Sequence, residues 1–149
     1  MAVVERKTKA GRTVTVQQYT RPGKHIGKRE RKGEGTSPAQ KEGNIRRAVM
    51  KLTWLMNANF SDGDLLVTLD YQRKNRPEDS AQMNRDFTNF YDRLKRALRR
   101  AGEPPPKYIR VLEVGSKGAR HHHMLLPKID LEILRKCWTA GGVHVDPLY

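Results

Sequence analysis

Three consecutive histidines, His121, His122 and His123, are the residues of this sequence with the clearest capacity for chemistry. They begin a stretch that continues with apolar residues to Leu126 and is bounded by Pro127, as expected of a β-strand. Because alternate side chains of a strand project to the same face, His121 and His123 point together and His122 points the other way. Two imidazoles on one face form half of a site for a divalent metal ion.

Glu113 is the candidate third ligand. It lies in a strand predicted over residues 107–114, and the turn Gly115-Ser116-Lys117-Gly118 separates that strand from the histidines. If the hairpin pairs residue 113 with residue 121, the carboxylate can share an ion with the two imidazoles. This pairing requires an odd number of loop residues or a bulge, and the two glycines make both solutions available.

A strand predicted over residues 65–71 supplies the floor of the site. Its residues Thr68 and Asp70 are polar and are predicted to lie beside His121 and His123, where Asp70 could also act as a ligand through water. We interpret His144, on a separate strand, as a surface or structural histidine. The residues of both strands predicted to face the helices are Leu65, Val67, Leu69, Tyr71, His122, Met124 and Leu126.

The order of elements from residue 64 onward defines the expected fold. Strands are predicted over 65–71, 107–114, 120–126 and 143–145, and helices over 80–101 and from the capping residue Asp130 to Trp138. Strand, helix, strand, strand, helix, strand is the split βαβ, ferredoxin-like α+β arrangement. It places the first and third strands at the centre of an antiparallel sheet, the second strand at an edge and both helices on one face. The aromatic stripe of the long helix is therefore predicted to be core.

The N-terminal part of the chain is predicted to be an appendage. Residues 1–36 form a basic, largely flexible arm with one short strand near residues 11–19, and the folded domain spans 37–149, opening with an extra helix at Ser37-Pro38. The arm has ten Lys or Arg residues and three Glu residues, so it could grip phosphates without reading sequence; a solvated tail is the equal alternative. Candidate phosphate contacts are Lys28, Arg29, Arg31 and Lys32 in the arm, and Lys117 and Arg120 near the histidines.

Composition narrows the class of partner. The 149 residues have a formal net charge of +14, which favours a polyanion, most commonly nucleic acid. A single cysteine, Cys137, excludes an internal disulfide and a multi-cysteine zinc site. No apolar run reaches the roughly 18 residues that span a membrane, and the N-terminus lacks the apolar stretch of a secretory signal. We therefore expect a cytoplasmic protein with no membrane association.

Three segments together resemble a known family. Glu113-Val114-Gly115, followed by the stretch from Gly118 through the histidines to Leu126, resembles the metal motif of rolling-circle replication initiators (Rep proteins) of phages and plasmids, in the HUH endonuclease superfamily. Residues 66–71 are similar to the family's first motif, which usually ends Thr-Leu-Thr-Tyr, with Asp70 in place of the second threonine. Trp138 and residues 141–145 match the helix and strand that follow the metal motif. The resemblance covers roughly residues 36–149.

The resemblance implies metal-dependent nicking and joining of single-stranded DNA at a replication origin. Mg²⁺ or Mn²⁺ held by His121, His123 and Glu113 would polarise the scissile phosphate, and a tyrosine would attack it to form a phosphotyrosine intermediate and a free 3′-hydroxyl. A host helicase and a polymerase are further candidate partners. The family's nucleophile is expected beyond Tyr149, and we assign that role to no tyrosine of this chain.

Two other functions fit the same composition. One is a non-catalytic nucleic-acid-binding module of ferredoxin-like fold, which would use the basic arm and the helix arginines. RNA-binding sheets of this shape usually expose aromatic residues on the open face, whereas the predicted open face here has histidines, Glu113 and Thr68. The other is a protein that keeps the metal site but only binds DNA.

Overall fold

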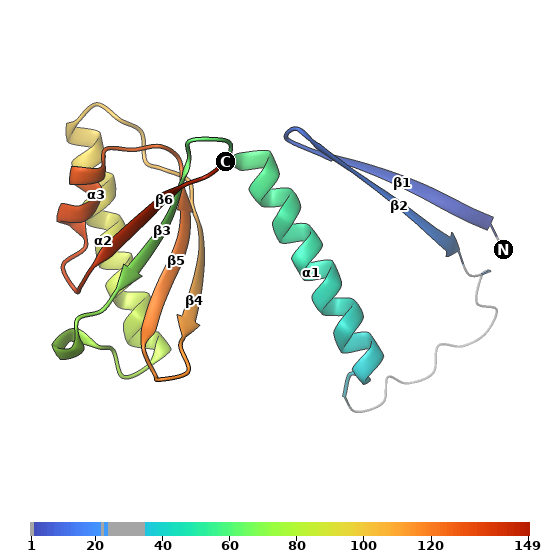
Figure 1. Ribbon diagram of the computed structural model, residues 1–149, viewed down its shortest axis with the longest axis horizontal. Coiled ribbons are helices and arrows are strands. Elements are labelled where there is room, and N and C mark those ends of the chain that lie inside the picture. The colour runs from blue at the N-terminus through green and yellow to red at the C-terminus, as the bar shows by residue number, and fades with distance from the viewer. Residues whose placement is uncertain (1, 22, 24–34) are drawn as a thin grey trace. The chain divides into compact units, whose positions relative to one another are not determined.

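The chain forms two compact units, Met1–Asn59 and Phe60–Tyr149, in a computed structural model that describes residues 2–21, 23 and 35–149 (Figure 1). The division therefore falls after the first long helix. The boundary predicted from the sequence, after residue 36, would have grouped this helix with the C-terminal sheet. Its contacts are instead with an N-terminal hairpin.

The first unit consists of a two-stranded hairpin and one helix. Strands β1 (Ala2–Ala10) and β2 (Thr13–Arg21) pair along their whole length, and helix α1 (Pro38–Asn59) begins at the predicted position. The hairpin turn rests on α1: a Cβ atom at Gly11 would lie 1.9 Å from the carbonyl oxygen of Asn57. The Trp54 indole also donates a hydrogen bond to the Thr15 hydroxyl, at 3.1 Å.

The prediction of one short strand in the N-terminal arm was wrong, because the structure has two strands of nine residues each. The first strand was missed because charged and polar side chains occur at most of its positions, so no apolar alternation marks it. Most of its side chains are exposed to solvent. The arm residues 24–34, which include four candidate phosphate contacts, lie outside the described residues.

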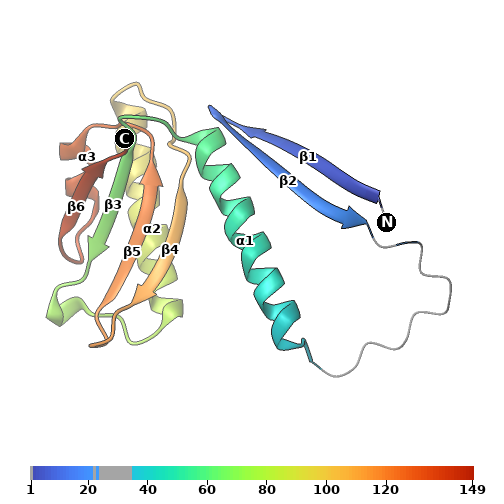
Figure 2. The ribbon, with the colours of Figure 1, turned by 45° about the vertical axis from the view of Figure 1, so that its right-hand side comes forward.

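The second unit is the predicted ferredoxin-like α+β domain. Its strands β3 (Leu65–Asp70), β4 (Ile109–Val114), β5 (Arg120–Leu126) and β6 (Val143–Pro147) form an antiparallel sheet in the order β4-β5-β3-β6. β3 and β5 are thus central, as predicted. A short 3-10 helix, η1 (Arg73–Asn75), follows β3. Helices α2 (Ser80–Arg100) and α3 (Leu131–Cys137) lie on one face of the sheet (Figure 2).

Each helix of this unit starts at an aspartate that satisfies free backbone N–H groups. The Asp79 side chain accepts a hydrogen bond from Gln82 N at 2.7 Å, and the Asp130 side chain accepts from the first turn of α3. α2 ends where Gly102 adopts a φ of +82°, a conformation that favours glycine. Among the described residues no helix has the length and apolar content needed to cross a membrane.

The core lies between the sheet and the two helices and confirms the predicted facing of β3 and β5. The inward residues of β3 and the aromatic stripe of α2 are buried, and so is His122, with no exposed surface. The opposite face of the sheet therefore presents His121 and His123, as alternation required. The central members of the core are Leu65, Val67, Leu69, Phe87, Phe90, Leu94, Leu98, Met124, Leu126, Leu134 and Trp138.

Candidate functional site

The β4–β5 hairpin brings Glu113 directly opposite His121. Glu113 and His121 are cross-strand partners, and the loop between the strands spans residues 115–119, an odd number as the pairing requires. Gly115 N donates to Ala119 O at 2.7 Å, and Gly118, at a φ of +74°, donates to Gly115 O at 2.8 Å. The turn chemistry thus sets the register on which a shared site depends.

Strand β3 contacts the same nitrogen, Nδ1, of both outer imidazoles. Thr68 is the register partner of His123, and its hydroxyl lies 3.1 Å from His123 Nδ1. Asp70 is the register partner of His121, and its Oδ1 lies 2.5 Å from His121 Nδ1. The two polar floor residues predicted from the sequence are therefore placed beneath the histidines, each bonded to one of them.

The other ring nitrogen, Nε2, of both imidazoles lies on the side of β4. His123 Nε2 contacts the Glu113 carboxylate, and His121 Nε2 lies 3.9 Å from where a Cβ atom on Gly115 would sit. The two ring centroids are 6.2 Å apart. Two imidazole nitrogens and one carboxylate thus converge above β4 and β5, which is the donor set predicted for a metal ion.

His144 joins this group from the far side of the sheet. Its Nε2 lies 2.9 Å from Asp70 Oδ2, while Asp70 Oδ1 faces His121. The side chain of His144 is 69% exposed, so it is a surface residue, yet it contacts the site through Asp70. We refer to Thr68, Asp70, Glu113, His121, His123 and His144 as the histidine–carboxylate cluster.

The backbone of Asp70 is held from two sides. Its N–H donates to Gly142 O at 2.9 Å, and its carbonyl accepts from the Trp138 indole at 2.8 Å. A Cβ atom on Gly141 would lie 2.0 Å from Asp70 O, so only glycine lets the chain pass this close. The Trp138 and Gly141-Gly142 segment recognised in the sequence therefore positions one residue of the cluster.

His122 faces the core and takes no part in the cluster. The Tyr71 hydroxyl lies 2.8 Å from its Nε2, and the ring packs against Phe87 and Trp138. Burial, aided by the positive charge of Arg110, lowers the pKa of His122 to about 4. The ring is therefore neutral at physiological pH and serves as core.

The tyrosines of the second unit lie away from the cluster. Tyr71 is bonded to His122 beneath the sheet, and burial raises its pKa, as does the nearby Asp86 carboxylate. Tyr91 donates its hydroxyl to Pro106 O at 2.6 Å. Tyr108 precedes β4 at the end opposite Glu113, and Tyr149 follows β6 beyond the pair Leu65–Pro147, at the far end of β3 from Asp70. This agrees with the decision to assign no nucleophile among them.

The two candidate phosphate contacts that fall in the described residues flank the histidines differently. Lys117 is exposed at the tip of the β4–β5 loop. Arg120 is partly buried, and its guanidinium donates to the Glu78 carbonyl at 2.7 Å. Lys117 is therefore the better placed of the two to meet a phosphate.

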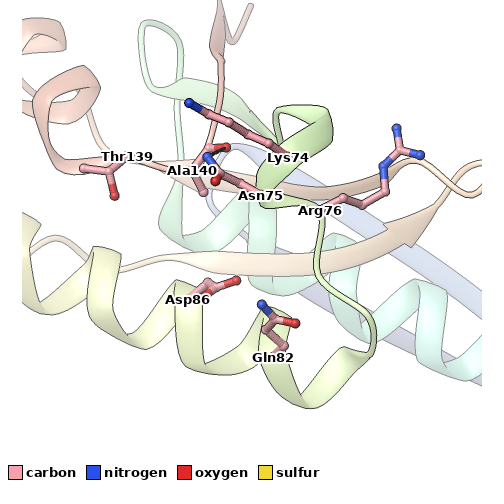
Figure 3. Close-up of a pocket in the computed structure, with 7 residues that line it drawn as sticks. All are labelled: Lys74, Asn75, Arg76, Gln82, Asp86, Thr139 and Ala140. Atoms are coloured by element: carbon pink, nitrogen blue, oxygen red, sulfur yellow. Dashed lines mark hydrogen bonds between the residues drawn. The ribbon is translucent and has the colours of Figure 1, made fainter.

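A polar pocket of about 380 Å³ lies next to the carboxyl end of β3 and was not anticipated from the sequence. In Figure 3 the η1 segment forms one wall, and Gln82 and Asp86 rise from α2 on the other. Asn75 closes one side by donating to the Ala140 carbonyl at 3.0 Å. No motif in the sequence marks the pocket, because its residues come from three separate segments. The lining residues are Lys74, Asn75, Arg76, Gln82, Asp86, Thr139 and Ala140.

A comparison with family models decides the relationship of the chain. Residues 64–149 match the model of a family of replication-associated proteins, the ORF2 type. The chain belongs to this family. No curated protein and no solved structure matches it.

Membership gives this replication-associated protein a role in the initiation of DNA replication. The matched region covers nearly all of the second unit and every member of the histidine–carboxylate cluster, whereas the hairpin and α1 fall outside it. The features of the replication-associated domain therefore belong to the sheet unit, and the basic N-terminal unit is an addition to it.

Proposed function

We propose that this replication-associated protein is an HUH-type endonuclease domain that binds Mg²⁺ or Mn²⁺ and nicks and rejoins single-stranded DNA during rolling-circle initiation. The observation that carries the proposal is the common orientation of two imidazoles. His121 and His123 each engage β3 through Nδ1, which leaves both Nε2 atoms on the side of β4, where the Glu113 carboxylate lies.

The chemistry of these donors fits a divalent cation. If Nδ1 of His123 donates to the Thr68 hydroxyl, its Nε2 carries a lone pair that faces the carboxylate of Glu113. Two acceptors in contact need a positive charge between them, either a proton or a metal ion. Among the described residues, no group of three or more His, Cys, Asp and Glu side chains is already spaced to hold an ion. Binding would require Glu113, whose side chain is 54% exposed, to move back from His123.

A bound divalent cation would supply positive charge against the scissile phosphate and its developing negative charge. In the proposed reaction a tyrosine oxygen loses its proton and forms a bond to phosphorus, and the bond from phosphorus to the 3′-oxygen breaks. The products are a 5′-phosphotyrosine and a 3′-hydroxyl that has taken up a proton. The residues of this chain would hold and orient the phosphate, with Lys117 in reach of the DNA backbone. The tyrosine is not assigned to any described residue.

Metal binding by the 149-residue chain tests the first half of the proposal. Titration with Mn²⁺, followed by calorimetry, should show one ion per chain. His121→Ala and His123→Ala should each abolish stoichiometric binding, because each removes one of two nitrogen ligands. Glu113→Gln should weaken it, and Glu132→Gln, an exposed carboxylate on α3, is the matched control that should bind as the original chain does.

Cleavage of single-stranded origin DNA tests the second half and uses the full product of the reading frame. We expect cutting that requires Mg²⁺ or Mn²⁺, leaves protein linked to the 5′ end, and disappears in the two histidine variants while their folding is preserved. Normal cutting by both variants would refute the nuclease assignment. Binding of DNA without any stoichiometric ion would favour the non-catalytic nucleic-acid-binding module instead.

A further inference from the structure

We infer that Asp70 and His144 form a positioning pair that orients His121 for metal binding; this rests on the function proposed above. The geometry singles out Asp70, because its two carboxylate oxygens contact two different imidazoles. Oδ1 lies 2.5 Å from His121 Nδ1, and Oδ2 lies 2.9 Å from His144 Nε2. Asp70 also occupies the position at which the family resemblance leads one to expect threonine.

Both outer imidazoles need an acceptor at Nδ1 so that the lone pair of Nε2 is available to a cation. Thr68 supplies a neutral acceptor to His123, whereas Asp70 supplies a charged acceptor to His121. A carboxylate that accepts from a ligating imidazole fixes the ring tautomer and raises the basicity of the other nitrogen. His121 should therefore be the stronger ligand of the two, and its strength should depend on Asp70.

His144 determines which role Asp70 can take. A carboxylate this close to the site could itself swing onto the ion and become a ligand. The hydrogen bond from His144 to Oδ2 holds the second oxygen toward β6, away from the side on which both Nε2 atoms lie. The backbone of Asp70 is fixed as well, by Gly142 and Trp138. Both constraints keep Asp70 beneath His121 as an orienting residue.

The experiment measures Mn²⁺ affinity in the 149-residue chain for three variants and a control. Asp70→Ala removes the acceptor and should lower affinity about 10- to 100-fold, the range usual for loss of an outer-shell partner. Asp70→Asn keeps an oxygen that can accept from Nδ1 but removes the charge, so its affinity should fall between Asp70→Ala and the original. His144→Gln should weaken binding less than Asp70→Ala. Asp146→Asn removes a charge from β6, at the register partner of Leu66, and should leave affinity unchanged.

A double variant separates a positioning pair from two independent residues. If His144 acts through Asp70, the variant carrying both His144→Gln and Asp70→Ala should bind as weakly as Asp70→Ala alone, with no further loss. Additive losses would overturn the pairing. Because His144 is largely exposed, its replacement should leave folding intact, which circular dichroism and thermal unfolding would verify.

Magnetic resonance of the histidine rings distinguishes orientation from direct ligation and from a purely structural role. Zn²⁺, which also accepts imidazole and oxygen ligands, serves as the diamagnetic probe. In the Zn²⁺-loaded chain, His121 should carry its proton on Nδ1, with a downfield signal that is lost in Asp70→Ala and shifted in His144→Gln. Absence of that signal in the original chain would mean that Asp70 has left His121 for the ion, and would overturn the inference.

The outcomes separate this inference from the proposed function. If the original chain binds no ion, the proposed function fails. If His121→Ala and His123→Ala abolish binding while Asp70→Ala folds and binds normally, the function stands and the positioning role of Asp70 fails.

Discussion

The stability of the second unit should fall in mild acid because of His122. This ring has no exposed surface, and burial lowers its pKa to about 4, with the charges of Arg110 and His123 acting in the same direction. In the unfolded chain its pKa returns to an ordinary value near 6.5. Between these two values the unfolded chain binds one more proton at this site than the folded chain does. The contribution is therefore fully present above about pH 6.5 and is lost as the pH falls towards 4.

The size of this effect follows from the two pKa values. At about 1.4 kcal/mol per pH unit, a fall from 6.5 to about 4 corresponds to at most about 3 kcal/mol. Tyr71, whose hydroxyl bonds to the ring, is itself partly exposed, so screening by solvent reduces this value. We expect a loss of about 2 kcal/mol, which is a large share of the stability of a small domain.

Urea denaturation from pH 4 to pH 8, followed by tryptophan fluorescence, measures this effect. The comparison is with His122→Gln, whose amide oxygen can accept from the Tyr71 hydroxyl but does not titrate in this range. All other titrating groups are common to both proteins, so the difference between the two curves isolates His122. The original chain should lose about 2 kcal/mol more than the variant between pH 6.5 and pH 4. Parallel curves would refute the reasoning.

Two further predictions concern packing. Gly141→Ala would place a methyl group 2.0 Å from Asp70 O and should destabilise the β3–β6 edge by at least about 2 kcal/mol in urea denaturation, whereas Gly43→Ala, in α1 with nothing within 4 Å, should be neutral or stabilising by up to about 1 kcal/mol. If both glycine variants behave alike, close backbone approach is not the reason for Gly141. Leu94→Ala, at a fully buried position of α2, should cost about 2–5 kcal/mol, and amide hydrogen exchange should show the loss in the second unit. A loss spread equally over the N-terminal hairpin would contradict the division into two units.

The sheet unit could be predicted from the sequence because its local signals agree with its tertiary packing. Alternation along β3 and β5 assigned each side chain to the correct face, and the caps Asp79 and Asp130 marked the helix starts. The odd loop between Glu113 and His121 also followed from pairing alone. These features depend on neighbours within one or two strands, which a linear pattern can express.

The features that were missed depend on contacts between distant segments or on weak local patterns. His144 reaches Asp70 across β3 and β6, residues 74 positions apart, and a lone histidine on an exposed strand carries no sign of such a partner. The strand Ala2–Ala10 lacks apolar alternation because it pairs in a solvated hairpin. The polar pocket beside η1 assembles from three loops and helices, none of which is unusual by itself.

The arrangement of the cluster follows from two registers that meet at β5. One register, with β4, sets Glu113 opposite His121; the other, with β3, sets Thr68 and Asp70 opposite the two histidines. Because side chains alternate, a shift of one residue in either register would carry its partners to the core face. The β3 register therefore determines which ring nitrogen is occupied, and the β4 register determines what faces the nitrogen left free. A change in the length of the 115–119 loop should thus affect Glu113 while leaving the Nδ1 contacts of both histidines in place.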